Sequence, residues 1–148
     1  MINYKVRVKN LIKKYGTRNP YSIALSMDIE IIEKFLSPQM PTAFFKKVLR
    51  RKFIVINLTK IRNDSDKYYA LAHELGHVYL HSSDRMFFLH DHTNYQRGRF
   101  EIEANRFAAE LLIDESEIDK IALREMCTSQ LSQYFGVPIE LVEYKFME

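Results

Sequence analysis

The feature that most constrains this 148-residue chain is the segment His73-Glu-Leu-Gly-His77, an H-E-x-x-H motif within a stretch of helical character. Two histidines four residues apart lie on one face of a helix, roughly 5–6 Å from each other. Both imidazoles can then converge on one metal ion, and Zn²⁺ binds histidine nitrogens at about 2.0–2.1 Å. Any fold for the chain must therefore keep this segment helical and leave room beside it.

Glu74 lies between the two histidines and is rotated about 100° from His73 around the helix axis. It cannot share their face as a simple ligand, but it can reach a water on the open side of a metal. A carboxylate there accepts a proton as general base. We therefore predict His73 and His77 as metal ligands and Glu74 as the catalytic residue. The alternative is a chance motif whose histidines are buried and bonded to backbone or carboxylate groups.

A catalytic zinc takes three protein ligands and keeps one position open. The helix predicted over 100–113 carries Glu101 and Asn105 at i, i+4 spacing. We predict Glu101 as the third ligand and Asn105 as the amide that steadies the outer N–H of a histidine. Glu103 points about 200° away from Glu101 and is expected to face solvent. His81 lies two turns from His73, so we interpret it as structural or as a partner of a ligand.

An oxyanion needs a donor besides the metal, because zinc alone rarely supplies all of the stabilisation. Tyr95, His90 and His92 are candidates, and the sequence does not choose among them. The two histidines are also possible ligands, although loops position ligands poorly.

These residues resemble the ImmA/IrrE family of metallopeptidases, a gluzincin-like family with H-E-x-x-H. In that family a Glu-x-x-x-Asn/Asp helix follows the histidine motif, and it falls here on Glu101 and Asn105. One departure is Leu112-Ile113-Asp114, where the family usually continues with Met-Pro; it affects a helix end. Together the matching segments cover most of the chain: KYGTRNP at 14–20, RKFIVIN at 51–57, LAHELGH at 71–77 and EIEANRFAAELL at 101–112.

The resemblance implies a zinc-dependent endopeptidase that cleaves a cytoplasmic regulatory protein. Family members often lie beside repressors in prophages and mobile elements, so the implied substrate is a helix-turn-helix repressor. The alternative is a non-proteolytic zinc-binding regulatory protein that acts by binding its partner. A zinc closed by four protein ligands favours that alternative, whereas an open position favours the enzyme.

The composition excludes several classes of protein. Lysine and arginine number 22 against 19 aspartates and glutamates, and a net charge of +3 does not imply direct nucleic-acid binding. A single cysteine, Cys127, excludes an intramolecular disulfide and is typical of a reducing compartment. Charges interrupt the first residues and no apolar run approaches ~20 residues, so we expect neither a secretory signal nor a membrane span. We predict a cytoplasmic protein.

Hydrophobic periodicity predicts an α+β fold with a small, twisted, mainly antiparallel sheet, a zinc-binding helix, a glutamate helix, and further N- and C-terminal helices. We expect one metallopeptidase domain over 1–148, with the C-terminal helices at 128–147 packed on it. Strand patterns occur at 29–31, 43–49 and 52–57, and helical patterns at 8–15, 20–26, 64–81, 100–113, 114–126 and on both sides of Gly136-Val-Pro138.

Three further segments suggest functions that we weigh against simpler interpretations. Lys46-Lys47 and Arg50-Arg51-Lys52 are expected to be a solvated hairpin turn, because such charges protect sheet edges. The segment 131–144 looks like a helix-turn-helix, but its second helix carries Glu140 and Glu143, which is unsuited to phosphates. The segment 53–57 is a candidate edge strand that could align an extended substrate.

Overall fold

The structure is a computed structural model that describes residues 2–81 and 94–147, and it confirms an α+β fold. Within these ranges the chain forms seven α-helices and one three-stranded sheet. The elements are α1 (Tyr4–Tyr15), α2 (Pro20–Ser26), β1 (Ile29–Lys34), β2 (Ala43–Val48), β3 (Arg51–Asn57), η1 (Leu58–Lys60), α3 (Asp64–Leu80), α5 (Asn94–Leu112), η2 (Glu115–Glu117), α6 (Lys120–Glu125), α7 (Thr128–Phe135) and α8 (Ile139–Phe146).

The N-terminal helices begin and end where local chemistry requires it. The Asn3 side chain accepts from the Val6 amide at the start of α1, and Gly16 ends that helix with φ of 71°. Glycine reaches this left-handed conformation without the Cβ clash that other residues meet. Asn19 caps α2 and Pro20 is its first residue, so the helix covers the predicted range 20–26. Apolar residues of both helices then turn inward to join the core.

The sheet has the strand order β1-β3-β2 and is mixed. The β2–β3 hairpin is antiparallel, whereas β1 lies parallel to β3 on the other side. The segment 53–57 is therefore the central strand, and its interpretation as an edge strand is wrong: Ile54 and Ile56 of β3 are fully buried. The open edges belong to β1 and β2. The lysines and arginines of the hairpin remain exposed or half-buried, as expected.

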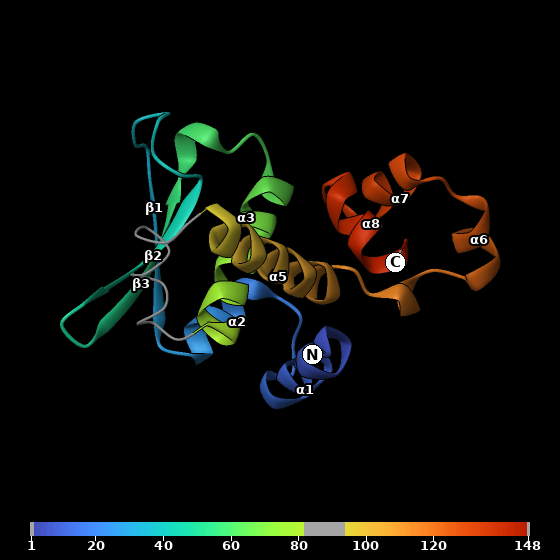
Figure 1. Cartoon of the computed structure of the whole chain (residues 1–148), viewed down its shortest axis with the longest axis horizontal. Helices are drawn as coiled ribbons and strands as arrows, with labels where there is room; N and C mark the ends of the chain where they lie inside the picture. Colours follow the sequence, from blue (N-terminus) through green and yellow to red (C-terminus); the bar gives the residue numbers. More distant parts are fainter. Residues whose placement is uncertain (1, 82–93, 148) are drawn as a thin grey trace.

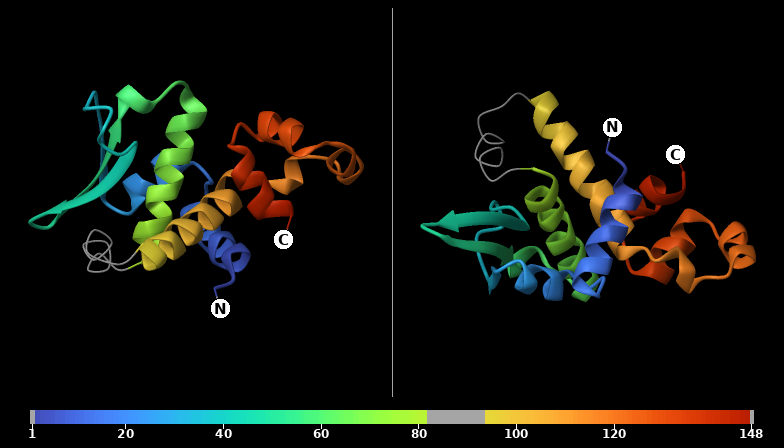
Figure 2. Two further views of the ribbon diagram at one scale, coloured as in Figure 1. Left: turned by 45° about the horizontal axis from the view of Figure 1, so that its top comes forward. Right: turned by 90° about the horizontal axis from the view of Figure 1, so that it is seen from below.

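Helix α3, which carries the H-E-x-x-H motif, lies between the sheet and α5 (Figures 1 and 2). Asn63 caps α3 with its side chain, one residue before the predicted start. The two helices approach closely at Gly76, where an added Cβ would lie 3.0 Å from the Cα of Ala104 and 3.1 Å from its carbonyl oxygen. A side chain at position 76 would push the helices apart. The close contact sets the distance between the polar residues of α3 and those of α5.

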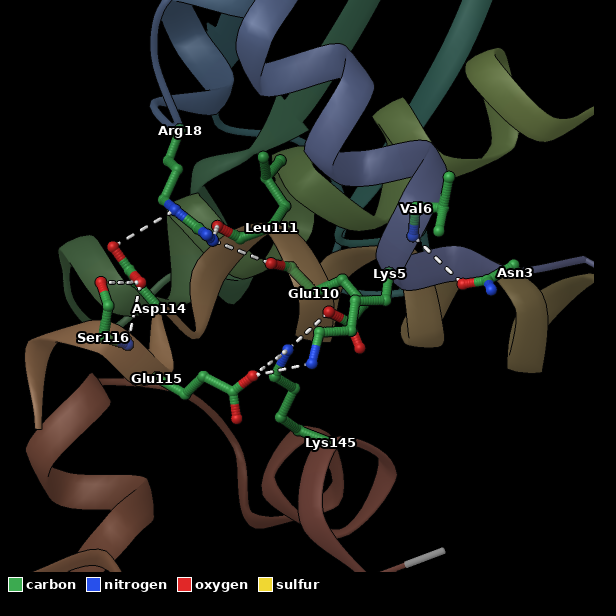
Figure 3. Close-up of polar contacts among 10 residues, drawn as sticks. All are labelled: Asn3, Lys5, Val6, Arg18, Glu110, Leu111, Asp114, Glu115, Ser116 and Lys145. Atoms are coloured by element: carbon green, nitrogen blue, oxygen red, sulfur yellow. Dashed lines mark hydrogen bonds and ion pairs between the residues drawn. The ribbon is translucent and has the colours of Figure 1, made fainter. Parts of the chain in front are cut away.

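The other faces and the far end of α5 are held by α1, α8 and a network of charges (Figures 2 and 3). The Arg18 guanidinium donates to the carbonyls of Glu110 and Leu111 at 2.9 and 3.2 Å. The almost fully buried Lys145 ammonium lies 2.5 Å from the Glu110 carboxylate. Cations here complement the unpaired carbonyls at the helix C-terminus. The helix is thus fixed at the end opposite to Glu101.

The segment after α5 differs from the single helix predicted over 114–126. Asp114 does cap a turn by accepting from the Ser116 amide, but that turn is the short 3₁₀ helix η2. Ile118 is extended and Asp119 begins a second helix, α6, by accepting from the Ile121 amide. Two competing N-cap residues divide the segment.

No helix within 2–81 and 94–147 is long and apolar enough to span a membrane.

Candidate metal centre

Helix α3 brings His73, Glu74 and His77 close together, and both histidines contact α5. The Nε2 atoms of His73 and His77 are 3.2 Å apart. One candidate ligand atom from each of the three residues lies within 4.8 Å of the others. His77 is buried and only 13% of the His73 side chain is exposed. The spacing in the motif therefore produces the convergence that the sequence predicts.

Helix α5 adds the Glu101 carboxylate to this pair. Its Oε2 lies 2.9 Å from His73 Nε2, and its Oε1 lies 2.8 Å from His77 Nε2. About half of the Glu101 side chain remains exposed, at 48%. Two imidazole nitrogens and one carboxylate, with solvent on the open side, are the kind of donor set that catalytic zinc sites in proteins use. The residues present thus fit a metal ion by the chemistry of their donors.

Asn105 holds the outer nitrogen of His73, as predicted. The Asn105 Oδ1 accepts from His73 Nδ1 at 2.7 Å and from the Tyr69 hydroxyl at 2.9 Å. With Nδ1 donating, a neutral His73 presents the lone pair of Nε2 to the metal position. The Asn105 amide faces Glu140 of α8 at 3.5 Å, which brings the C-terminal helices to the site.

Tyr69 was missed by the sequence analysis. It lies one helical turn before His73, and this i, i+4 spacing is the signal that could have found it. Burial raises the pKa of the Tyr69 phenol to about 12, with the negative charges of Glu140 and Glu101 adding to the effect. Tyr69 therefore stays protonated at neutral pH and keeps donating to Asn105.

Glu103 does not face solvent, and that prediction is wrong. Its side chain is 10% exposed, and its Oε2 lies 3.0 Å from His81 Nε2. His81 follows the end of α3 in an extended conformation, with φ of −118° and ψ of 137°. Its ring therefore lies where no continued helix would place it, and it covers the face of α5 that carries Glu103. His81 Nδ1 in turn lies 3.2 Å from His77 Nδ1, so His81 is a partner of the motif as expected.

Glu74 is buried and lines the same cavity as His73 and Glu101. Burial raises the pKa of the Glu74 carboxyl to about 7; the nearby His73 opposes this shift and Glu101 adds to it. A carboxyl with a pKa near neutrality can both take up and release a proton under physiological conditions. This is the protonation behaviour that a general base requires.

When no metal is bound, Glu101 and His73 stabilise each other's charged forms. Burial acts to raise the pKa of Glu101, but hydrogen bonds from His73 and His77 outweigh it and hold that pKa far below its usual range. Burial acts to lower the pKa of His73, whereas its hydrogen bond to Glu101 raises it, and the net shift is upward. A proton on His73 thus competes with a metal for the same nitrogen.

The cavity beside these residues has a volume of about 800 Å³, large enough for several residues of a peptide. Lys60 and the ion pair between Arg62 and Asp66 line its wall, and Ala43 of the outer strand β2 lines it too. The lining residues are Pro41, Thr42, Ala43, Thr59, Lys60, Arg62, Asp66, Tyr69, Ala70, His73, Glu74, Glu101, Asn105 and Pro138.

The three candidate oxyanion donors stay as predictions. His90 and His92 lie outside the described residues. Tyr95 belongs to the first turn of α5, and its side chain is likewise outside the described part.

The comparisons with known proteins agree with this geometry. Residues 24–147 match the model of the peptidase M78 family, the IrrE N-terminal-like domain. The chain belongs to the M78 peptidase family. The resemblance to ImmA/IrrE metallopeptidases is thereby confirmed, and membership implies a peptidase role and a bound metal ion.

Two relatives of this M78 chain match over nearly its whole length. An uncharacterised immunity region protein 2 from Bacillus phage phi105 is 35% identical over 141 residues, covering 95% of this chain and 87% of the relative. The metallopeptidase ImmA of Bacillus subtilis is 27% identical over 146 residues, covering 97% and 84%.

A solved structure, described as a Mycobacterium tuberculosis transcriptional regulator, has the same fold. Its TM-score is 0.62 at 17% sequence identity, and the match covers 96% of this chain. The M78 chain spans 45% of the length of that structure, so the likeness shows the fold alone.

Proposed function

We propose that this protein is a zinc-dependent endopeptidase that cleaves a cytoplasmic regulatory protein. The observation that carries the proposal is the convergence of two histidine nitrogens and the Glu101 carboxylate beside the buried Glu74. His73, His77 and Glu101 would hold the metal, Asn105 would orient His73, and Glu74 would act as general base. When bound, zinc would supply Lewis acidity towards a water and a peptide carbonyl.

Glu74 carries the proton in the proposed reaction. Its carboxylate takes a proton from the attacking water and passes it to the nitrogen of the leaving amine. Its burial keeps the pKa near 7, so that neither step is strongly uphill. The surrounding wall of α3 and α5 excludes water from the inner side of Glu74, which is 9% exposed.

The sheet edge supports a polypeptide as the substrate. Because β2 is an outer strand, one row of its backbone groups is free of sheet partners within the described residues. Ala43 at the start of β2 lines the same cavity as His73 and Glu74. An extended segment of substrate pairing with β2 would pass directly over these residues. Binding along a strand selects internal peptide bonds, which favours endopeptidase activity.

Two observations support a repressor as the substrate. The resemblance to ImmA/IrrE proteins implies a helix-turn-helix repressor, and one relative is an immunity region protein of a phage. We therefore propose that the substrate is a DNA-binding repressor of a phage or mobile element.

The test uses Glu74→Gln, because glutamine has a similar shape but cannot accept a proton. Purified protein loaded with zinc is incubated with the helix-turn-helix repressor encoded beside its gene, and fragments are identified by mass. We expect wild type to cut at one or a few bonds, and the variant to retain its zinc but lose about 10²–10⁴-fold in rate. The exposed Glu125→Gln in α6 is the matched control and should cut normally.

Two outcomes contradict the proposal. Cleavage by Glu74→Gln at the wild-type rate would remove the general base from the mechanism. Wild type that binds zinc and the repressor yet leaves it intact would favour the alternative, a regulatory protein that acts by binding its partner.

A further inference from the structure

A buried chain of side chains runs from the metal position away from the cavity. His77 Nδ1 lies 3.2 Å from His81 Nδ1, and His81 Nε2 lies 3.0 Å from Glu103 Oε2. The side chains of His77, His81 and Glu103 are 4%, 2% and 10% exposed. Solvent therefore contributes little to these ring nitrogens, and the contacts between the three side chains supply hydrogen bonds that water would otherwise make.

When a metal takes the lone pair of His77 Nε2, the two ends of this series of side chains fix the direction of each hydrogen bond; without a metal, His77 Nε2 faces the Glu101 carboxylate 2.8 Å away and donates to it. A carboxylate accepts, so His81 Nε2 donates to Glu103. In a neutral His81 ring, Nδ1 then carries the lone pair and must accept. His77 Nδ1 is the donor to it, which leaves His77 Nε2 directed at the metal position. In the metal-bound state, the acceptor at Glu103 and the metal at Nε2 thus together place the remaining proton of His77 on Nδ1.

We propose that His81 and Glu103 are positioning residues for His77. They hold its ring with the proton on Nδ1 and with Nε2 directed at the metal. Asn105 holds the His73 ring in the same way. Helix α5 thereby supports both histidines of α3 as well as supplying Glu101. This inference deepens the proposed function and rests on the metal site being at His73 and His77.

Three contacts keep the positioning residues in place. The His81 amide donates to the His77 carbonyl at 2.9 Å, which ends α3. The Phe100 ring packs edge-on against the His81 ring with 4.4 Å between centroids. Arg99 Nε donates to the second oxygen of Glu103 at 3.0 Å. Each polar atom of the chain thus has a defined partner, and the rings have little freedom to turn.

The burial of His81 and Glu103 argues that these two polar side chains do more than fill space. A buried polar pair costs desolvation energy that apolar side chains of similar volume avoid, so packing alone does not favour His81 with Glu103. The carboxylate–histidine arrangement is the one that fixes tautomers of metal-ligating histidines in proteins generally. Here an additional imidazole lies between the carboxylate and the ligand.

The first test needs no variant and uses the zinc-loaded protein. Full-length zinc-loaded protein with ¹⁵N-labelled histidine is examined by long-range nitrogen–proton NMR. We expect a proton on His77 Nδ1, none on His81 Nδ1, a proton on His81 Nε2, and a scalar coupling between the two Nδ1 atoms through the hydrogen bond. A proton on His81 Nδ1 with a bare His77 Nδ1 would overturn the proposal.

The second test measures the Kd for zinc by competition with a chelator. His81→Phe keeps an aromatic ring against Phe100 but removes both nitrogens, and it should weaken binding about 10–100-fold. Glu103→Leu should weaken it similarly. His81→Asn restores an acceptor close to the Nδ1 position and should recover most of the affinity. The unfolding transition of each variant is followed in parallel, so that a loss of fold is recognised.

The double variant His81→Phe/Glu103→Leu shows whether Glu103 acts through His81. We expect its Kd to match that of His81→Phe alone, because one chain is broken in both. The proposal would be contradicted if the fold-losses in zinc affinity of the two single variants multiplied in the double variant. A normal Kd in His81→Phe would contradict it as well. If wild type takes up no zinc, the proposed function fails and this inference fails with it. If wild type binds zinc but His77 Nδ1 carries no proton, the inference alone fails.

Discussion

The carboxyl of Glu74 gives the most direct residue-scale prediction, in the metal-free protein. Its pKa is about 7 in the fold and near 4.5 when unfolded, so the folded state binds the extra proton between these values. A group that binds more protons when folded loses stability as pH rises. Wild type should therefore be destabilised between pH 4.5 and 7 relative to Glu74→Gln, which does not titrate.

The difference of about 2.5 pH units corresponds to roughly 3 kcal/mol of unfolding free energy at pH 8. Urea unfolding in chelator at pH 5 and pH 8 measures it. Glu125→Gln, on the exposed side of α6, should follow wild type at both values. An advantage of Glu74→Gln that is equal at both pH values would show that burial does not hold a proton on Glu74.

At the scale of residues, sequence spacing predicted which side chains share one face of a regular helix. Glu101 and Asn105 fall on the face of α5 that meets the histidines, because i, i+4 positions share a face wherever the helix packs. Glu103 was misjudged for a physical reason. Its partner His81 lies just beyond α3 in an extended conformation, and no helical wheel describes that position.

At the scale of elements, the crossing of α3 and α5 depends on Gly76. An alanine Cβ there would lie 3.0 Å from the main chain of Ala104, so α5 must shift by a few tenths of an ångström. Overpacking costs about 1–3 kcal/mol, and the gain in helix propensity offsets up to about 1 kcal/mol. We expect Gly76→Ala to lower the unfolding free energy by roughly 1–2 kcal/mol and to weaken zinc binding.

Gly98→Ala is the matched control within α5, because nothing lies within 4 Å of its added Cβ. It should leave zinc binding unchanged and stabilise the protein by up to about 1 kcal/mol. Urea unfolding and chelator competition measure both variants. Equal behaviour of the two alanines would mean that the close approach at Gly76 does not position the ligands.

Helices and strands were predictable as elements, but their arrangement was not. Apolar periodicity and N-caps located most helices, and β-branched residues located β3. The alternation of side chains in 53–57 does not say which neighbours the strand has, so its central place in the sheet was missed. Strand order depends on tertiary contacts between residues far apart in sequence, such as the pairing of Ile31 with Ile54.

For the whole molecule, metal binding and folding should be one equilibrium. The proposed ligands come from α3 and α5, whose apolar faces form the core, so unfolding must release the ion. Zinc at 100 times its Kd should add about 2.7 kcal/mol to the unfolding free energy. Calorimetry with zinc and with chelator measures this, and Glu101→Gln should show a much smaller shift.

The same scans test whether the chain is a single domain. Glu140 of α8 reaches Asn105, and Lys145 of α8 pairs with Glu110 of α5, so we expect α7 and α8 to unfold with the rest. One transition, shifted as a whole by zinc, is the expected result. Two transitions, of which zinc shifts one, would divide the chain into separately folding parts.

The contact at Gly76 also has an evolutionary consequence. The atoms that exclude a side chain there are the Cα and carbonyl oxygen of residue 104, which every amino acid carries. A substitution at 104 therefore cannot compensate for one at 76, whereas the Phe107 ring can be exchanged for a smaller side chain. Divergence at position 76 would require the whole of α5 to move, carrying Glu101, Glu103 and Asn105 with it. Related proteins that keep this site should therefore tolerate substitutions at positions around residue 76 more readily than a substitution at residue 76 itself.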